Sequence, residues 1–489
     1  MIPTIKLIEK EQQLGNTVII VPSLERLPAG LFSASEKRYI RERVTDYKEE
    51  VVSFNRLTHL EYVYVVKEEP DLPKRLEAAR KAGDKVAGCL NSAKAKKVTL
   101  FDPEGEGGIV LAFAEGMALG SYQFLKYMKD REKENTLKEI EVYTPPPAPL
   151  PTLSGRGRGG VHLNILLDAV ARCRDLINEP NSYLTATVFA REAEKMAKES
   201  GARAEVMNKQ KIAALKMGGL LGVNQGSLEP PTFTVMEWKP ADAVNDKPLV
   251  LVGKGIVYDS GGMNLKPGDS MRNMKDDMSG AGAVAAAVYA IAKAGLPVHV
   301  VGLMPATDNR PGPRAFVSSD IITMHDGTTV EVIDTDAEGR LILADALSYA
   351  RRFDPMLVID LATLTGAAVR AFGKFGAAAM QSKAVKELEL LKQSGFAVHE
   401  RLVEIPAWDE YGDLIKSDIA DLKNLGPPEA GMITAGKFLE KFTGYPYIHL
   451  DIAGPAFLDQ RDSYRGQGGT GFGVRLLFEF AHLLTRSPF

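Results

Sequence analysis

Asp334-Thr335-Asp336-Ala337-Glu338-Gly339-Arg340 is the stretch around which the fold and the chemistry of this chain can be interpreted. It follows an alternating run at residues 328–333, which predicts a strand, and it precedes residues 341–347, whose apolar spacing predicts a helix. In open α/β sheets, ligands bind at turns of this kind, outside the carboxyl ends of the strands. Carboxylates this close together raise one another's pKa values unless cations lie among them. The stretch therefore predicts either a solvated turn or a metal site.

The composition is that of an ordinary globular protein. The chain has 489 residues, 45% of them apolar, which is enough for two or three domains with proper cores. Lys and Arg total 60 against 63 for Asp and Glu, so the charge does not favour nucleic acid or an anionic membrane as a partner. Charges interrupt the first ten residues, and no apolar run reaches roughly 18 residues. We expect a cytoplasmic protein without a membrane span.

The two cysteines, Cys89 and Cys173, are too few and too far apart for a disulfide framework or a thiolate zinc site. We expect both to be plain buried thiols.

Residues 1–143 alternate predicted strands, such as 17–21, 62–66 and 98–101, with helical patterns such as 73–80. They predict a smaller N-terminal α/β domain with an accessory or assembly role. Residues 144–160 are rich first in proline and then in glycine and arginine. Because proline fixes φ and has no amide donor, this segment predicts a stiff linker.

Residues 161–489 predict the larger, catalytic domain. A helix is expected at 163–177, and Thr185 is expected to cap a second helix that reaches Lys198. Strand and helix then alternate, with strands expected at 233–238, 248–252, 298–303, 330–333 and 356–359. The small side chains at 279–290 predict a buried central helix. The fold class is therefore α/β in two domains, the larger with a mixed, mostly parallel sheet flanked by helices.

Three of these expected strands run into polar clusters, at 253–262, 334–340 and 360–367. Neighbouring parallel strands end at one edge of a sheet, so we expect the clusters to meet in one cleft. The residues that would meet are four acids and three cations, namely Asp259, Asp277, Asp336, Glu338, Lys254, Lys266 and Arg340. Two divalent cations would neutralise the four carboxylates, although the residues do not choose between Zn²⁺, Mn²⁺ and Mg²⁺. Each acid taken singly also fits a solvated loop or a helix cap.

Other chemistries fit less well. The seven histidines are scattered without a His-Glu-x-x-His pattern, and there is no Gly-x-Ser-x-Gly, so a zincin and a serine hydrolase are both disfavoured. Gly253-Lys254-Gly255 lacks the spacing of a phosphate loop. We expect the histidines to be structural, with His449, at the end of an expected strand, as the one to follow.

From about residue 174 to the end, the chain resembles the leucyl (cytosol) aminopeptidases, which are dinuclear metallopeptidases. Their signature Asn-Thr-Asp-Ala-Glu-Gly-Arg-Leu matches residues 334–341 except at the first position, where this chain has Asp334. Further similar stretches lie at 252–255, 259–262, 266–267, 274–278, 360–367, 433–436 and 449–454. Before the proline-rich segment the resemblance is weak, with only 115–116 and 120–122 familiar.

The resemblance implies a role for each matching residue. The tighter metal would be held by Lys254, Asp259, Asp277 and Glu338, and the more exchangeable one by Asp259, Asp336 and Glu338. The catalytic residues would be Lys266 and Arg340. The pocket for the first side chain of the substrate would be lined by Met274, Thr363, Leu364, Gly366 and Ala453.

The resemblance also implies the cofactors and partners. We expect two divalent metal ions, Zn²⁺ or Mn²⁺ with Mg²⁺ as a third candidate, and a bicarbonate held at Arg340. Peptide substrates with leucine-like first residues and a homohexameric assembly are expected as well. Two alternatives stay open, a two-metal phosphoesterase and a non-catalytic relative. Asp334 adds a charge beside the site, or it makes the same local turn hydrogen bonds as the family's asparagine.

Overall fold

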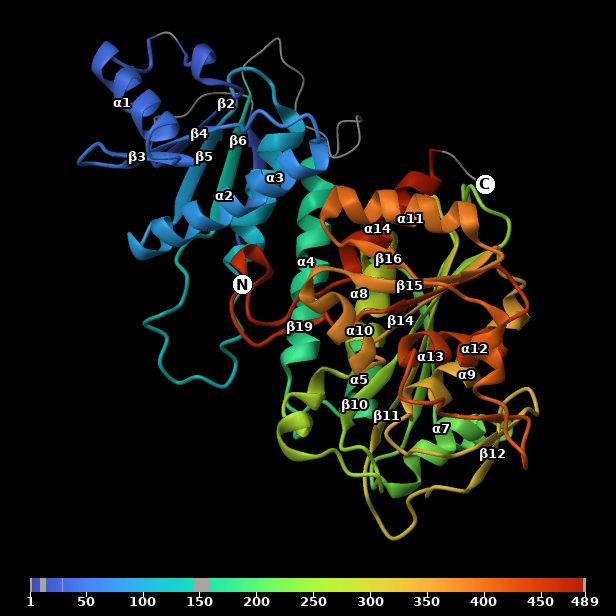
Figure 1. Ribbon diagram of the computed structural model, residues 1–489. Helices are drawn as coiled ribbons and strands as arrows, with labels where there is room; N and C mark the ends of the chain where they lie inside the picture. Colours follow the sequence, from blue (N-terminus) through green and yellow to red (C-terminus); the bar gives the residue numbers. More distant parts are fainter. Residues whose placement is uncertain (1, 9–14, 29, 145–158, 487–489) are drawn as a thin grey trace. The chain divides into compact units, whose positions relative to one another are not determined.

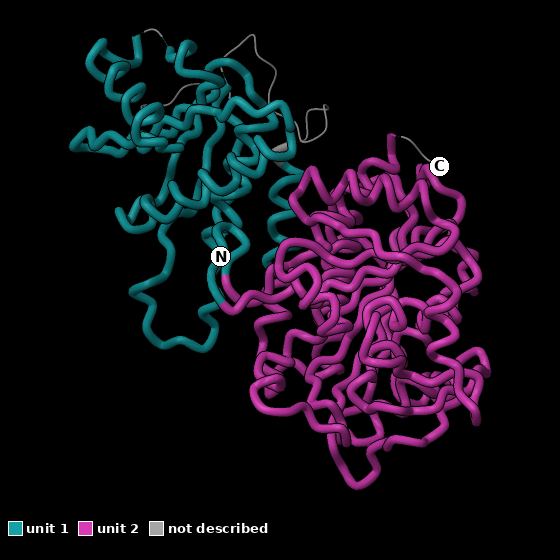
Figure 2. The backbone as a smooth tube through the Cα atoms, in the orientation of Figure 1, with its two compact units in different colours: residues 1–171, 460–466 teal, residues 172–459, 467–489 magenta. Residues whose placement is uncertain are grey.

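The computed structural model describes residues 2–8, 15–28, 30–144 and 159–486. It divides into two compact units, shown in Figure 2. One unit comprises residues 1–171 with 460–466, and the other comprises 172–459 with 467–489. The linker expected at 144–160 lies almost entirely outside the described residues, so its role as a domain boundary stays a prediction.

The first unit is built on a six-stranded sheet in the order β1-β6-β5-β2-β4-β3. All neighbouring strands pair in parallel except β3 and β4, which are antiparallel at one edge. The strands are β1 Thr4–Ile8, β2 Thr17–Val21, β3 Val51–Asn55, β4 Leu60–Val65, β5 Lys97–Phe101 and β6 Glu139–Tyr143. The helices are α1 Ala34–Thr45, α2 Leu72–Ser92 and α3 Gly107–Gly120. The strands expected from the sequence are confirmed to within a few residues, and the helical pattern at 73–80 is the first part of the longer helix α2.

Local sequence explains these elements. Every residue of β2, Thr-Val-Ile-Ile-Val, is buried, as expected for a parallel strand covered on both faces. Helix α1 begins with a capping box, in which the Ser33 hydroxyl accepts from the Glu36 amide and the Glu36 carboxylate accepts from the Ser33 amide.

Residues 460–466 belong to the first unit although they lie near the end of the chain. The Tyr464 hydroxyl donates to Glu77 Oε2 at 2.7 Å. Arg461 Nη2 donates to Asp84 Oδ1 at 2.6 Å, and Ser463 Oγ donates to Asp84 Oδ2 at 3.2 Å. These side-chain hydrogen bonds fasten this late segment to α2.

The second unit is built on a mixed sheet in the order β16-β15-β18-β14-β9-β11-β8-β7, with β10 paired to β11. Strands β18, β14, β9 and β11 are parallel neighbours, and antiparallel pairs flank them. The strands are β7 Arg203–Met207, β8 Thr232–Trp238, β9 Leu249–Gly253, β10 Gly255–Asp259, β11 Val300–Asn309, β14 Leu357–Ala362, β15 Ala377–Ser382, β16 Leu402–Glu404 and β18 Tyr447–Asp451. The expected mixed, mostly parallel sheet is confirmed.

Helices cover both faces of this sheet (Figure 1). The helices of this unit are α5 Ala186–Ser200, α6 Lys209–Ala214, α7 Gly218–Val223, α8 Ser279–Lys293, α9 Gly339–Ala350, α10 Gly366–Phe372, α11 Val385–Val398, α12 Asp409–Asp413, α13 Gly431–Glu440 and α14 Val474–Leu484. The boundary between the units falls within α4, Gly159–Asn178. In β11, Val301 and Leu303 join the core that contains α9, whereas Gly302 between them faces α8. Because alternate residues of a strand point to opposite faces, α8 and α9 lie on opposite sides of the sheet.

Helix α8 is the buried small-residue helix expected from the sequence. All residues from Ser279 to Ala292 are buried, and the helix packs on α5, α14 and the central strands. The expected cap at Thr185 is also present, since its hydroxyl accepts from the Val188 amide at 3.3 Å.

One expectation about topology is wrong. The strand before the 334–340 turn is only β13, Thr329–Glu331, and it does not lie in the main sheet. It pairs antiparallel with β12, Ile321–Thr323, and parallel with β17, Leu422–Lys423, in a separate three-stranded sheet. The 334–340 turn therefore reaches the cleft from beside the main sheet, not from a neighbouring strand within it.

The cysteine expectation is half correct, since Cys173 is buried but Cys89 is exposed on α2. No helix in the described part of the chain is both long and apolar enough to cross a membrane.

Candidate metal centre

Strands β9 and β10 deliver the first two site residues. Lys254 lies between them, and its backbone amide donates to Leu361 O at 3.0 Å while its carbonyl accepts from the Ala281 amide at 2.8 Å. The backbone of Lys254 is thus fixed between β14 and the start of α8. Asp259 ends β10, and its Oδ1 accepts from the Gly261 amide at 2.8 Å and from Asn309 Nδ2 at 2.9 Å. These bonds orient its other oxygen, Oδ2, toward the cluster.

The turn after Asp259 requires glycine. Gly261 has φ +87°, a region that L side chains rarely adopt, and a Cβ built there would lie 2.4 Å from Asn264 O. The same Cβ would stand 3.1 Å from Asp336 Oδ1. Glycine therefore lets the chain turn and lets the two acid-bearing loops approach each other.

Asn424, next to β17, holds the 334–340 turn. Its Oδ1 accepts from the amides of Ile333 and Asp334, and its Nδ2 donates to Asp334 O at 2.7 Å. Within the turn, Asp334 Oδ1 accepts from the Asp336 amide at 2.8 Å. Asp334 therefore makes the local turn hydrogen bond expected for this position.

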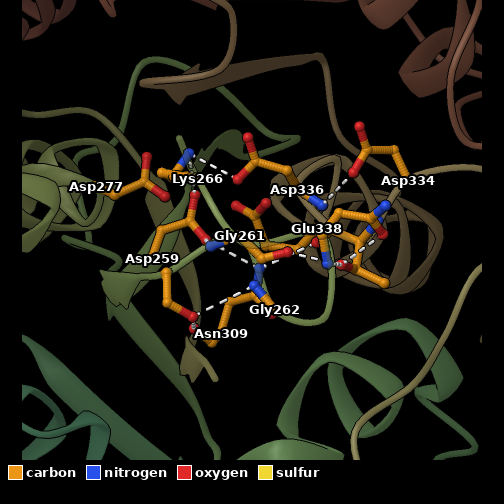
Figure 3. Close-up of polar contacts among 12 residues, drawn as sticks. Asp259, Gly261, Gly262, Lys266, Asp277, Asn309, Asp334, Asp336 and Glu338 are labelled. Atoms are coloured by element: carbon orange, nitrogen blue, oxygen red, sulfur yellow. Dashed lines mark hydrogen bonds and ion pairs between the residues drawn. The ribbon is translucent and has the colours of Figure 1, made fainter. Parts of the chain in front are cut away.

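The acids and lysines gather in one cluster (Figure 3). Ligand atoms of Asp259, Asp336 and Glu338 all lie within 4.8 Å of one another. Lys266 Nζ lies 2.7 Å from Asp259 Oδ2 and 2.7 Å from Asp336 Oδ1. Lys254 Nζ lies 2.7 Å from Asp277 Oδ1 and 3.1 Å from Glu338 Oε1. Six of the seven residues expected at the site therefore lie together in this cluster, and the seventh, Arg340, borders the same cleft.

Burial and mutual repulsion perturb the acids. Burial raises the pKa of Asp336 to about 7, and the neighbouring carboxylates of Asp259 and Glu338 add to the shift. Burial also raises the pKa of Glu338, with Asp259 next in effect, and raises that of Asp277 well above its ordinary value despite the nearby ammonium of Lys254. Negative charge in the cluster exceeds what the two lysines balance.

The lysines are perturbed in the opposite sense. Burial alone would lower the pKa of Lys254, but the carboxylates of Asp277 and Glu338 outweigh burial and raise it. The pKa of Lys266 is raised in the same way, against burial, mainly by Asp259. Both lysines are therefore cations while they face the acids alone.

Unpartnered carboxylate oxygens show that the donor set fits divalent cations. Asp277 Oδ2 and Glu338 Oε2 are buried and accept no hydrogen bond, and Glu338 Oε1 faces the Lys254 ammonium at 3.1 Å. Buried carboxylate oxygens normally have hydrogen-bond partners or coordinate metals. Oxygen ligands together with an amine suit Mn²⁺ or Zn²⁺, and two dications would offset the excess negative charge.

Arg340 lies in the first turn of α9 and is buried. Its Nη1 donates to Asn424 O at 2.7 Å, whereas its Nε has no hydrogen-bond partner. Burial lowers its pKa to about 10, so the guanidinium is still charged at neutral pH. It borders the same cleft as the acids.

The cleft has a volume of about 640 Å³. The five residues expected to line the pocket for the first side chain all border it, namely Met274, Thr363, Leu364, Gly366 and Ala453. Asp451 fixes this wall, because its carboxylate accepts from the Leu364 amide at 3.2 Å and from the Thr365 hydroxyl at 2.6 Å.

His449 is structural, as expected for the histidines. It is fully buried in β18, and its Nδ1 lies 2.9 Å from Asp360 Oδ1 in the neighbouring strand β14. It is not among the residues that border the cleft.

Several site residues were not found from the sequence. Asn309 and Asn424 orient Asp259 and the 334–340 turn, while Asp276, Arg370 and residues 425–428 border the cleft. Single asparagines carry no spacing signal, and residues 425–428 reach the cleft only through the pairing of β13 with β17. Arg370 lies three residues after the polar cluster at 360–367, and no spacing pattern marked it as a site residue.

Comparison with known proteins agrees with this architecture. The family model described as "Cytosol aminopeptidase family, catalytic domain" matches residues 171–478, and the corresponding N-terminal domain model matches residues 73–131. The "Probable cytosol aminopeptidase" of Chlorobium limicola is 45% identical over 381 residues, which is 76% of this chain and 74% of that protein. That of Geobacter sulfurreducens is 43% identical over 385 residues, or 77% of this chain and 75% of that protein.

Two solved structures are similar to this protein over nearly its whole length. A mutant of tomato leucine aminopeptidase is similar with a TM-score of 0.84 and 26% identity, covering 98% of this chain and 96% of that one. The bottromycin maturation enzyme BotP in complex with Mn is similar with a TM-score of 0.82 and 29% identity, covering 96% of this chain and 100% of that one.

Proposed function

The chain belongs to the cytosol aminopeptidase family, and from that membership we propose that its carboxylate cluster removes N-terminal residues from peptides with the help of two divalent metal ions. The family assigns the activity itself, that of a metallo-exopeptidase. The observation that carries the metal assignment is the set of buried oxygens on Asp277 and Glu338 that accept no hydrogen bond. We further propose a preference for leucine and other apolar first residues, since Met274, Leu364 and Ala453 border the cleft.

We assign the metal ligands as follows. One ion would be held by Lys254, Asp259, Asp277 and Glu338, and the other by Asp259, Asp336 and Glu338. Lys254 must lose its proton to coordinate, which direct contact with a dication favours. When bound, the ions supply a water of lowered pKa as the nucleophile. Mn²⁺ is supported by the BotP complex with Mn, whereas Zn²⁺ rests on the donor set alone.

The carboxylates of the cluster account for the proposed restriction of cleavage to the first residue of a peptide. A free α-amino group is a cation at neutral pH and is attracted to a cluster in which carboxylates outnumber lysines. An internal peptide bond offers no such cation. The wall of Thr363, Leu364 and Gly366 then places the first side chain beside the cluster.

Lys266 is assigned the role of stabilising the oxyanion that develops during attack on the peptide bond. Its side chain is 14% exposed, and it borders the cleft on which the cluster opens. A fixed ammonium there stabilises negative charge on the carbonyl oxygen of the first peptide bond, an effect of roughly 3–4 kcal/mol by analogy with oxyanion-hole donors.

Arg340 is assigned to the proton transfer. Among the described residues of the cleft no histidine is present to act as a base. Arg340 has a charged guanidinium with an unpartnered Nε, which suits a small anion such as bicarbonate. We propose that Arg340 would hold bicarbonate there, and that this anion would supply a base for proton transfer between the nucleophile and the leaving amine.

The test uses the full-length protein after its metals have been removed and their content measured. Release of leucine from leucyl-p-nitroanilide and from leucylglycine is expected to be negligible with chelator and to return with Mn²⁺ or Zn²⁺. Hydrolysis of p-nitrophenyl phosphate is expected to stay at background. Activity that ignores the chelator, or a metal-loaded protein that cleaves only the phosphate ester, would overturn the proposal. An inert metal-loaded protein would instead support a non-catalytic relative.

We also propose that the protein is a cytoplasmic homohexamer. The support is the resemblance to the leucyl aminopeptidases and the word "cytosol" in the names of its relatives. Light scattering on purified protein decides the assembly, and a mass other than six chains would remove this part of the proposal.

A further inference from the structure

Arg370, on the short helix α10, is a cation of the cleft that the proposed chemistry does not use. It is exposed and borders the same cleft as the acid cluster. Its side chain forms no hydrogen bond and no ion pair with the residues that the structure describes. The other cations that border the cleft are engaged, Lys254 and Lys266 by carboxylates and Arg340 by Asn424 O.

The guanidinium is placed against the wall of the first side-chain pocket. Arg370 Nη1 lies 3.3 Å from the position that a Cβ on Gly366 would occupy. Gly366 is one of the five residues assigned to that pocket. A substrate side chain that passes Gly366 therefore ends beside the guanidinium.

The side chain of Arg370 is free to bind an anion. Of the other residues that border the cleft, Val369, Pro427 and Pro428 are uncharged, while Asp276, Asp334 and Asp336 are acidic. A guanidinium binds a carboxylate through two parallel hydrogen bonds, and an apolar wall strengthens the attraction. The methylene stem of arginine still offers an apolar surface to uncharged side chains.

We propose that Arg370 is a specificity-determining residue that admits acidic first residues, so that the enzyme removes N-terminal glutamate and aspartate as well as leucine-like residues. The inference rests on the proposed function, because it concerns the substrates of the same site. Arg370 acts on binding of the side chain and takes no part in the proton transfers.

The test compares glutamyl-p-nitroanilide with glutaminyl-p-nitroanilide, which differ in charge but scarcely in size. The ratio of their kcat/KM values is expected to fall about fivefold in Arg370→Gln, as for an ion pair of roughly 1 kcal/mol. Arg370→Lys is expected to keep most of the ratio, and Arg370→Glu to lower it further and to raise cleavage after lysine. Arg191→Gln is the matched control, since Arg191 is also an exposed arginine on a helix, α5, and does not border the cleft.

A second arm separates the two sources of a substrate carboxylate. Leucylglycine carries a terminal carboxylate one residue beyond the cleaved bond, and leucylglycinamide does not. If Arg370→Gln changes only the ratio between these two dipeptides, the arginine binds the far end of the substrate and the inference is overturned. A glutamate-to-glutamine ratio that is equal in the parent and all residue-370 variants overturns it too. Loss of leucyl-p-nitroanilide cleavage in the metal-loaded parent would refute the proposed function instead.

Discussion

Lys266 holds two of the carboxylates that we assign to the exchangeable metal. Its ammonium bridges Asp259 and Asp336 at 2.7 Å from each. A dication bound by those oxygens would compete with the ammonium for them and repel it, so we expect metal binding to weaken the contacts of Lys266 with these acids. The ammonium would then be available to face a substrate carbonyl, in the role that we propose for it.

The first prediction at this scale concerns pH. Asp336 has a pKa raised to about 7 by burial and by its acidic neighbours, and only its ionised form binds a cation. The affinity for the exchangeable metal, the ion assigned to Asp259, Asp336 and Glu338, is therefore highest above pH 7. It is expected to fall as the pH drops below 7, by up to about tenfold per pH unit. Titration of metal-free protein with Mn²⁺ between pH 5.5 and 8 measures it.

The same titration is repeated with one test variant and one control variant. Asp336→Asn is expected to bind this metal weakly and with a smaller pH dependence, to which Glu338 still contributes. Asp334→Asn is the control, because an amide oxygen can accept the same hydrogen bond from the Asp336 amide. A parent affinity that is flat across pH 7 would contradict the assignment of Asp336.

The second prediction concerns Arg340. Arg340→Ala is expected to lower kcat on leucyl-p-nitroanilide by about 100-fold and to change KM by less than about threefold, because the residue acts in the transition state and not in binding. Steady-state kinetics with added bicarbonate measures both constants. An unchanged kcat would remove the assignment. A thermal melt of the variant checks that the lost hydrogen bond to Asn424 O has not unfolded the site.

At the scale of elements, the contact between α8 and the sheet decides where Lys254 stands. A Cβ on Gly280 would lie 2.0 Å from Leu361 O and 2.9 Å from Lys254 N, both backbone atoms. The small side chains of α8 thus let the helix approach β9 and β14 closely. That approach holds the backbone of Lys254 between them.

The prediction from this contact is that Gly280→Ala lowers the free energy of unfolding by about 1–3 kcal/mol or more, because backbone has to shift. It is also expected to weaken metal binding, since Lys254 would move. Thermal melts and metal titration measure the two effects. Gly444→Ala is the control, because nothing lies within 4 Å of a Cβ at Gly444, and a change below about 0.5 kcal/mol is expected there. Equal melting temperatures for the two variants would refute the packing argument.

The elements also show what a sequence can and cannot predict. Strands β2 and β9 and helix α8 follow from composition and periodicity, because all their residues are buried except Lys293 at the end of α8. The position of β13 does not follow. It is three residues long, and its pairing of Val330 with Leu422 joins segments far apart in the sequence. No local pattern reports such a contact.

At the scale of the whole molecule, the charged residues of the site could be predicted but their supports could not. Asp259, Asp277, Asp336 and Glu338 stand out as acids beside expected strand ends, and the resemblance assigned their roles. Asn309 and Asn424 became visible only when distant loops were brought together in space. The route of the 334–340 turn was mistaken for the same reason, although its residues arrive at the expected cluster.

Residues 460–466 tie the end of the chain to its beginning through Tyr464 and Arg461. Proteins are synthesised from the amino terminus, and early domains usually fold while the rest is still being made. Here the first unit can assemble its sheet early but acquires the side-chain bonds of Arg461, Ser463 and Tyr464 only after residue 466 has left the ribosome. Completion of that unit therefore waits until residues 172–459 of the second unit have been synthesised.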